Sequence, residues 1–426
     1  MGSLLLAAIM LHILGARGEP PPLRYCNAEM KRKHDRVIVA GGGPVGSLAA
    51  LLLARAGIPV TLLEREAGVQ LDYRASTFHP PTLDLLEECG AEAALLRMGL
   101  KCTTSQFRDR EKGRIAEFDL SVLENDTRHP YRLQCEQFKL VGWLHGELRR
   151  IPGVELLFGR NITRVETTED GVAVYVEGGE TFHCDYLIGA DGGRSAVRKA
   201  AGIAFEGITF PEHFLVAGTR YDFKRHMPDI CSVNYTADPV EWYLLLEIPD
   251  MWRVITAADP AVEPSEAVQE SRLQASLQNL LPRPEPYEIL VKGVYRVHQR
   301  VAAAYRRGRV FLAGDAAHLN NPLGGMGLNG GLHDVLSLVP RLIDVWNGRK
   351  PDSELDGYEP QRRPEAIHAI NAITARNKKL MEERDPAVRE RNLRQMAEIA
   401  SDPRRAYDYM LEASMITSLR RCGMLR

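Results

Sequence analysis

The sequence predicts an α/β protein in which a discontinuous sheet-and-helix domain of Rossmann-like topology contains an inserted mixed β-sheet domain and ends in a helical tail. Three observations predict this fold. A glycine-rich turn at residues 41–46 joins an apolar strand to a helix, an acid–glycine pair follows the apolar run 186–189, and a long glycine-rich loop follows the run 309–313. Residues 205–297 have strand-like runs but no such loops. The first domain is therefore expected to consist of two separated parts of the chain.

The composition limits the class of partner. The chain has 426 residues, 45% hydrophobic and 26% charged, which is typical of a globular protein of two or three domains. The net charge of −2 gives no general field that would attract nucleic acid or an anionic membrane, so we expect small-molecule partners. The seven cysteines lack C-x-x-C spacing, and no His and Cys group has metal-ligand spacing. We expect reduced thiols, no metal site, and an organic cofactor for any redox chemistry.

Residues 1–34 form an apolar and proline-rich leader. Its apolar run at residues 4–11 is well short of the roughly 20 residues that span a bilayer, while residues 16–18 have a small-x-small cleavage pattern. A disordered extension, a weak membrane-associating helix and a signal peptide all remain open. We expect a cytoplasmic protein that contacts a membrane, if at all, only through this leader. Membrane association or secretion is the alternative if the leader is functional.

The first motif belongs to a strand–helix–strand unit. Residues 36–40 are a β-branched run typical of a strand that is buried on both faces. The Ala- and Leu-rich stretch 47–56 predicts a helix that ends at Gly57, and residues 58–63 predict the next strand. Such a unit is the building block of a parallel sheet.

The turn of this unit has the spacing G-x-G-x-x-G, formed by Gly41, Gly43 and Gly46. Glycine permits the tight turn and a close approach of the backbone, and the helix N-terminus presents unpaired N–H groups to a pyrophosphate. Glu64 ends the second strand, where its carboxylate can accept hydrogen bonds from both ribose hydroxyls. An acid there disfavours a 2′-phosphate, so the resident nucleotide is predicted to be FAD or NAD rather than NADP.

The other two motifs place acids after buried strands. Asp191 follows the strand 186–189, although it could also cap a structural turn. Asp315 follows the third apolar run and could bind a ribityl or ribose hydroxyl. The loop 322–331 then leads into a helix predicted to begin near Leu328, and its amides could face an electron-rich ring or an oxyanion.

Together these motifs resemble the single-component (group A) FAD-dependent aromatic hydroxylases, the family of para-hydroxybenzoate hydroxylase and phenol hydroxylase. The resemblance covers roughly residues 35–350. It implies FAD as the resident cofactor and NADPH or NADH as co-substrate. By position, it implies that the following residues bind the cofactor: Gly41, Gly43, Pro44, Val45, Gly46, Glu64, Arg65, Arg74, Gln134, Asp191, Gly314, Asp315, Pro322, Gly324, Gly325, Met326, Gly327, Leu328 and Asn329.

The resemblance also implies roles for individual residues. Arg74 would lie near the pyrophosphate, Gln134 would bond the cofactor, and residues 322–329 would lie along the isoalloxazine. The Asp191 motif would serve both FAD and the passing nicotinamide. The expected domains are the leader (1–34), the FAD-binding domain in two parts (35–204 and 298–350), the substrate-binding sheet domain (205–297) and the helical tail (351–426).

The implied reaction begins when NAD(P)H reduces the flavin. Dioxygen then gives a flavin C4a-hydroperoxide, which delivers one oxygen to an aromatic, phenol-like or other electron-rich small molecule. The catalytic residues stay unassigned, because the tyrosine and histidine relay of the family finds no clear match. We interpret Tyr235, Tyr243, His226 and His298 as core or surface residues, while Arg296 and Arg300 either hold an anion or form structural ion pairs.

Three other classes of protein share this scaffold. An FAD-dependent dehydrogenase or reductase would need the same cofactor motifs, and oxygen in the product separates it from a monooxygenase. A non-catalytic binding protein is a remote alternative, since the intact Glu64, Asp315 and glycine loop favour a bound cofactor. A flavin-dependent halogenase is disfavoured because Trp242 and Trp252 form no W-x-W-x-I-P segment.

Overall fold

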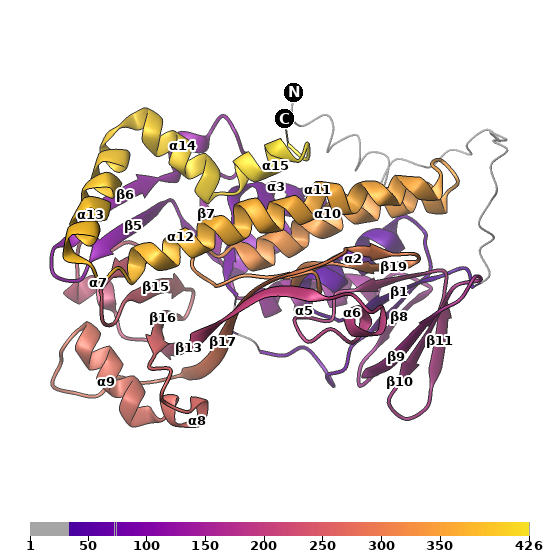
Figure 1. Cartoon of the computed structure of the whole chain (residues 1–426), viewed down its shortest axis with the longest axis horizontal. Coiled ribbons are helices and arrows are strands. Elements are labelled where there is room, and N and C mark those ends of the chain that lie inside the picture. The colour runs from indigo at the N-terminus through magenta and orange to yellow at the C-terminus, as the bar shows by residue number, and fades with distance from the viewer. Residues whose placement is uncertain (1–33, 72, 74, 426) are drawn as a thin grey trace.

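The structure is a computed structural model that describes residues 34–71, 73 and 75–425. The predicted leader up to residue 33 and the predicted site residue Arg74 lie outside the described residues. Figure 1 shows two sheets side by side, one containing β1 (Val37–Ala40) and one containing β15 (Tyr243–Ile248), with long helices of the C-terminal third lying across both. The predicted α/β architecture with a mixed second sheet and C-terminal helices is confirmed.

The six-stranded sheet is the layer that contains the predicted nucleotide-binding motifs. Five of its strands are parallel and the edge strand β18 is antiparallel. Its order is β18 (Arg306–Arg307), β19 (Val310–Leu312), β12 (Tyr186–Gly189), β1, β2 (Val60–Leu63) and β8 (Val154–Leu157). Because β1, β2, β12 and β19 run the same way, the motifs that follow them all meet at one edge, outside the carboxyl ends of the strands where open α/β sheets bind ligands.

Helix α2 (Pro44–Arg55) follows the first glycine turn and packs against α5 (Gln137–Leu148) and α10 (Met326–Trp346). It begins at Pro44, three residues before the predicted start. Proline is tolerated in the first turn, because the N–H groups of that turn have no partner within the helix and the missing N–H therefore costs no hydrogen bond. Its Ala- and Leu-rich face is almost fully buried. Helix α10 likewise begins at Met326 rather than Leu328, after Gly325 in the left-handed conformation (φ 66°).

The eight-stranded sheet is mixed, since β14 and β5 are parallel neighbours and the other described pairs are antiparallel. Its order is β20 (His318–Leu319), β17 (Val291–Ala302), β13 (Phe205–Thr219), β16 (Met251–Ala258), β15, β14 (Val233–Ala237), β5 (Thr104–Asp109) and β6 (Gly113–Asp119). Three of these strands come from ranges predicted to form the FAD-binding domain: β5 and β6 from residues 35–204, and β20 from residues 298–350. A parallel pairing between segments so far apart in sequence leaves no local signal, so the ranges do not separate the two sheets.

Two small sheets and several short helices complete the fold. The predicted hairpin is a three-stranded meander of β9 (Ile162–Thr167), β10 (Val172–Val176) and β11 (Thr181–Cys184), and the second small sheet consists of β3 (Thr77–Phe78), β7 (Arg132–Gln134) and β4 (Leu100–Cys102). The remaining helices before α10 are α3 (Pro80–Glu88), α4 (Glu92–Met98), η1 (Leu120–Leu123), α6 (Ala196–Ala200), α7 (Phe223–His226), α8 (Pro264–Ala267), α9 (Glu270–Leu280) and η2 (Gly314–Ala316).

The C-terminal tail is helical, as predicted. It comprises η3 (Asp352–Gly357), α11 (Tyr358–Glu365), the π-helical turn η4 (Ala366–Asn371), α12 (Ala372–Met381), α13 (Pro386–Ser401), α14 (Pro403–Ala413) and α15 (Ile416–Arg421). Leu393, Met396 and Met410 of this tail share one apolar cluster with Phe214 of β13 and with Trp242, which directly precedes β15. The tail is therefore part of the core. Within the described residues, no helix is long and apolar enough to cross a membrane.

Candidate active site

The first glycine turn and Glu64 form one hydrogen-bonded unit. Glu64 Oε2 accepts from the N–H of Gly42 at 2.6 Å, and Oε1 accepts from the N–H of Glu66 at 2.9 Å. Gly46 lies against the turn rather than in the cavity, because a Cβ there would stand 2.0 Å from the carbonyl oxygen of Gly41. Gly46 thus lets helix α2 approach the turn, and its expected contact with a cofactor stays without support.

The Asp191 motif lies directly beside this turn. A Cβ on Gly41 would stand 2.3 Å from the carbonyl oxygen of Ala190, and the φ of +104° at Gly41 is itself one that glycine favours. Asp191 Oδ2 accepts from the N–H groups of Ala196 at 2.7 Å and Val197 at 3.1 Å, so it fixes the start of α6. Burial raises the pKa of Asp191. Its Oδ1 is buried without a hydrogen-bond partner among the described residues.

The third motif divides into residues that line the cavity and residues that support it. Gly314 is a supporting residue, with a φ of +59°, and its N–H donates to Asp334 Oδ2 at 3.0 Å. Asn329 is also buried behind the loop. Its Oδ1 accepts from the N–H of His79 at 2.9 Å, and its Nδ2 donates to the carbonyl oxygen of Thr77 at 2.9 Å. Asn329 therefore fastens the loop to β3.

Gln134 lies fully buried on β7. Its Oε1 accepts from the hydroxyls of Thr77 at 3.0 Å and Ser76 at 3.3 Å, and both of these residues line the cavity. Its Nε2 has no hydrogen-bond partner among the described residues. A buried amide donor beside a cavity is expected to serve a bound ligand, since leaving it unpaired costs about 1–3 kcal/mol.

All of these motifs surround one cavity of about 520 Å³. Aliphatic side chains of the eight-stranded sheet line its other wall, including Val233, Leu244, Leu246 and Ile255. The predicted residues that line it are Gly41, Gly43, Pro44, Val45, Glu64, Arg65, Asp191, Asp315, Pro322, Gly325, Met326, Gly327 and Leu328. Gly324 instead borders a second chamber of about 30 Å³.

Sequence reasoning missed several residues of this cavity. His145 of α5 has its Nε2 2.9 Å from Ser47 Oγ and 3.1 Å from the carbonyl oxygen of Gly42, and burial lowers its pKa. Arg253 of β16 is buried and donates to Ser76 Oγ at 2.7 Å. Arg132 of β7 is buried at the far end. None of these belongs to a spaced motif, so only the three-dimensional arrangement identifies them.

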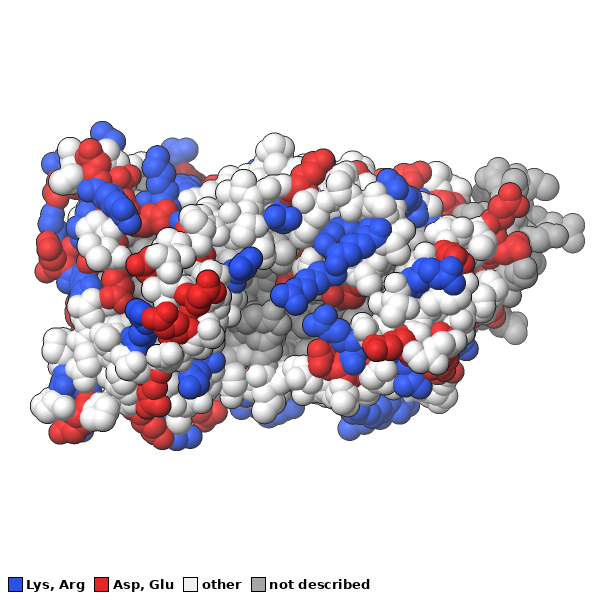
Figure 2. Space-filling model, turned by 60° about the horizontal axis from the view of Figure 1, so that its bottom comes forward, with Lys and Arg blue, Asp and Glu red and all other residues white. Residues whose placement is uncertain are grey.

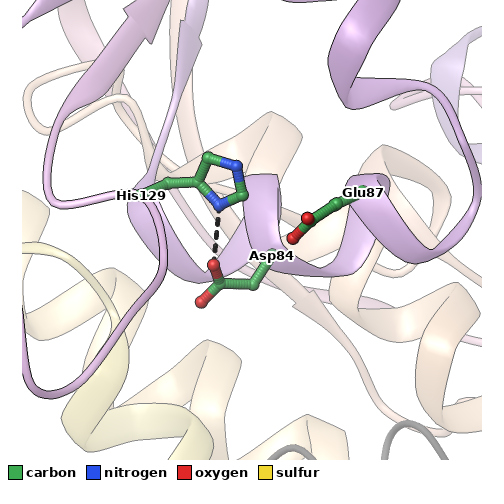
Figure 3. A group of neighbouring side chains, drawn as sticks. All are labelled: Asp84, Glu87 and His129. Carbon is green, nitrogen blue, oxygen red and sulfur yellow. Dashed lines mark hydrogen bonds and ion pairs between the residues drawn. The ribbon is translucent and has the colours of Figure 1, made fainter.

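A separate cluster of Asp84, Glu87 and His129 could present three metal-ligand atoms (Figure 3). His129 Nδ1 lies 2.7 Å from Asp84 Oδ1, and its Nε2 lies 3.1 Å from Glu92 Oε1. Arg128 Nε forms an ion pair with Glu87 Oε2 at 2.6 Å. Because cationic and donor side chains of the protein already bind these carboxylates, we interpret the cluster as a structural contact between α3, α4 and the loop before β7.

The residues around the large cavity fit a dinucleotide. One end has a glycine turn, a helix N-terminus and a fixed carboxylate, and the middle has buried polar atoms of Gln134 and Asp191 that no described group satisfies. At the other end, the cavity is bordered by an apolar wall, and the space beside it can hold a second, smaller molecule. This arrangement defines an oxidoreductase that binds a flavin dinucleotide beside a small-molecule pocket.

Comparisons with known proteins identify the family. Residues 35–372 match the family model described as an FAD binding domain. The chain is 34% identical over 394 residues to para-nitrophenol 4-monooxygenase of Pseudomonas sp. (strain WBC-3), which covers 91% of this chain and 97% of that protein. It is 35% identical over 348 residues to 6-hydroxy-3-succinoylpyridine 3-monooxygenase HspB of Pseudomonas putida, covering 80% and 88% respectively.

The crystal structure of p-nitrophenol 4-monooxygenase PnpA from Pseudomonas putida DLL-E4 superposes with a TM-score of 0.86 at 32% identity, covering 93% of this chain and all of that one. The chain therefore belongs to the FAD-dependent aromatic hydroxylases of the FAD-binding-domain family. It is an enzyme, an FAD-dependent monooxygenase that uses NAD(P)H and dioxygen to hydroxylate an aromatic small molecule. This confirms the predicted family, cofactor and reaction class.

Proposed function

We propose that the enzyme hydroxylates a small single-ring phenol or hydroxypyridine in the part of the cavity next to the eight-stranded sheet. The observation that carries this proposal is the continuity of the cavity, which runs from the glycine motifs to the aliphatic wall of that sheet. Relatives of nearly the same length act on para-nitrophenol and 6-hydroxy-3-succinoylpyridine, which are small single-ring compounds.

We further propose the following placement of FAD. Gly41, Gly43 and the start of α2 would receive the pyrophosphate, and Glu64 the adenosine ribose, while Asp191 and Asp315 would serve the ribityl and pyrophosphate stretch. The loop Pro322–Leu328 would lie along the isoalloxazine, with Gln134 Nε2 donating to the cofactor. When bound, FAD accepts hydride from NAD(P)H and activates dioxygen. The protein orients the ring, and its aliphatic wall excludes water from it.

The cysteines bear on the cellular compartment of the enzyme. We infer that the enzyme works in the reducing cytoplasm. Six cysteines fall within the described residues and all are free thiols, and burial raises the pKa of four of them (Cys89, Cys102, Cys135 and Cys184) to about 12. Such thiols are inert, and free thiols are typical of proteins in reducing compartments.

The test is oxygen incorporation by the purified flavoprotein. It is mixed with NADH or NADPH, ¹⁸O₂ and a panel of para-substituted phenols and hydroxypyridines, and the products are examined by mass spectrometry. We expect one ¹⁸O atom per product molecule with at least one single-ring substrate. A parallel reaction in H₂¹⁸O with ordinary dioxygen should give no label. Oxidation of the nucleotide that yields only hydrogen peroxide with every ring would contradict the proposed substrate class.

A further inference from the structure

Arg132 is a buried cation at the inner end of the cavity. Only 4% of the residue is exposed, and it lies on β7, paired in register with Cys102 of β4. It borders both the 520 Å³ cavity and the adjoining 30 Å³ chamber, together with Tyr235 and Met326. Residues two apart on a strand face the same side, so Arg132 lies on the same face of β7 as Gln134.

Among the buried arginines of the described residues, Arg132 differs because its side chain forms no hydrogen bond or ion pair. Its Nε is buried and unsatisfied, as is the Nε of Arg253, whose Nη1 nevertheless donates to Ser76. Arg108 binds both carboxylate oxygens of Asp229, and Arg362 binds Asp334. The remaining three buried arginines, Arg198, Arg253 and Arg309, donate to carbonyl or hydroxyl oxygens. A buried charge without a partner is costly, so a missing anion is expected at Arg132.

No carboxylate of the described residues forms an ion pair with Arg132. The acidic residues that line the large cavity, Glu64, Glu66, Asp191 and Asp315, all belong to the nucleotide-binding motifs, and the small chamber is lined by none. The neighbouring His79 is fully buried, and its burial together with the charge of Arg132 lowers its pKa to about 3, so it stays neutral. The nearby walls are aromatic and apolar, with Phe107, Phe118 and Tyr409.

We propose that Arg132 determines substrate specificity by binding an anionic oxygen, a phenolate or a carboxylate, on the aromatic substrate. A guanidinium has planar donors that match two oxygens, and its bonds to an anion are about twice as strong as neutral ones. This inference rests on the proposed function for the presence of an aromatic ring in the pocket. It adds that the enzyme prefers anionic rings and that Arg132, rather than a residue of the glycine motifs, is responsible.

The test measures ligand binding to the oxidised holoenzyme from the change in flavin absorbance, so it needs no turnover. The ligands are 4-hydroxybenzoate and its neutral isostere 4-hydroxybenzamide, with para-nitrophenol titrated above and below the pKa of its hydroxyl. We expect the wild type to bind each anionic form more tightly. Arg132→Met should weaken binding of the anions about tenfold to a hundredfold and change amide binding less than about threefold. Arg132→Lys should restore part of the loss.

Arg114→Met is the matched control, because Arg114 is an exposed arginine of β6 outside both cavities. FAD content and melting temperature report whether each variant is folded. If Arg132→Met weakens binding of the anion and of the amide equally, the inference is overturned. It is also overturned if the wild type shows no preference for anions, a measurement that remains possible if Arg132→Met fails to fold. Labelled oxygen in the product with unchanged selectivity in Arg132→Met would overturn the inference alone. Arg132-dependent binding without oxygen insertion would overturn the proposed function alone.

Discussion

The acidic residues around the cavity differ in their exposure, since Asp315 is exposed while Glu64 and Asp191 are partly buried. Glu64 accepts backbone N–H groups on both oxygens, and Asp191 accepts two on one oxygen. These two carboxylates are thus fixed by the main chain. Asp315 is an exposed residue that lines the cavity directly after the short helix η2 begins. Its removal is therefore expected to affect a ligand more than the fold.

Asp315→Ala should reduce the affinity for FAD at least tenfold, because a charge-assisted hydrogen bond to a hydroxyl contributes about 1.5–3 kcal/mol. The variant should keep its circular dichroism spectrum. The measurement is the ratio of flavin to protein absorbance after dialysis, followed by titration with FAD. Glu169→Ala, which changes an exposed residue of the turn between β9 and β10, serves as the control. A fully flavinylated Asp315→Ala variant would remove Asp315 from the cofactor site.

The residues of the glycine and acid motifs differ in how well their positions could be predicted from the sequence. The spacing of glycines and acids correctly locates Gly41, Glu64 and Asp191 around one cavity. It does not predict which way each residue faces, and Gly46 and Asn329 support the loops from behind. Arg132 and His145 give no signal in the sequence, because neither residue belongs to a motif with a recognisable spacing.

At the scale of elements, His129 joins three segments. It lies between Asp84 of α3 and Glu92 of α4, and it holds the loop before β7 against both helices (Figure 3). Burial by itself would lower the pKa of His129, but the hydrogen bonds and charges of Asp84 and Glu92 outweigh it, and the pKa is raised. Protonation of His129 therefore stabilises the folded state.

The sign of the pH dependence follows from this raised pKa. The stabilisation is fully present at a pH below the pKa of His129 in the unfolded state, about 6.5. It is lost as the pH rises through the higher pKa of His129 in the folded state. The difference in melting temperature between the wild type and His129→Gln should therefore shrink between pH 6 and pH 9. His183→Gln, a change at an exposed histidine of β11, is the control. A difference that stays constant with pH would contradict the interpretation of His129 as a charged link.

Elements differ in how well the sequence predicts them. The buried parallel strands β1, β2 and β12 are recognisable as short β-branched runs, and the tail is recognisable from its charged amphipathic helices. Strands β5 and β6 were not assigned to the second sheet. Their partner β14 follows more than a hundred residues later in the sequence, and long-range pairing is determined by packing rather than by local pattern.

At the scale of the whole molecule, the two sheets meet at the cavity, and Figure 2 shows Lys and Arg side chains gathered near the middle of one face. Arg194 lines the cavity. Arg296, His298 and Arg300 occupy every second position of β17, so their side chains lie on the same face of the strand. The hydroxyl of Thr209 lies 2.9 Å from His298 Nδ1 and 2.9 Å from Arg300 Nη2. Burial, followed by the charges of the three arginines, lowers the pKa of His298.

These three arginines form no ion pair within the described part of the chain, so their charges are available to an anion that approaches the cavity. NAD(P)H is the anion that must reach the flavin in each cycle, and we expect its phosphates to contact this group. The double variant Arg194→Gln, Arg296→Gln should raise the KM for NAD(P)H about tenfold, since two charge-assisted contacts are lost. FAD content and kcat at saturating nucleotide should stay close to the wild type.

Steady-state rates with NADH and NADPH at low and high salt provide the measurement, and Arg225→Gln on the exposed helix α7 is the control. Salt should raise the KM of the wild type more than that of the double variant, because screening weakens only the contacts that the variant has lost. A rise in KM for NADPH alone would locate the 2′-phosphate at these arginines. An unchanged KM for both nucleotides would mean that the hydride donor approaches the flavin along another path.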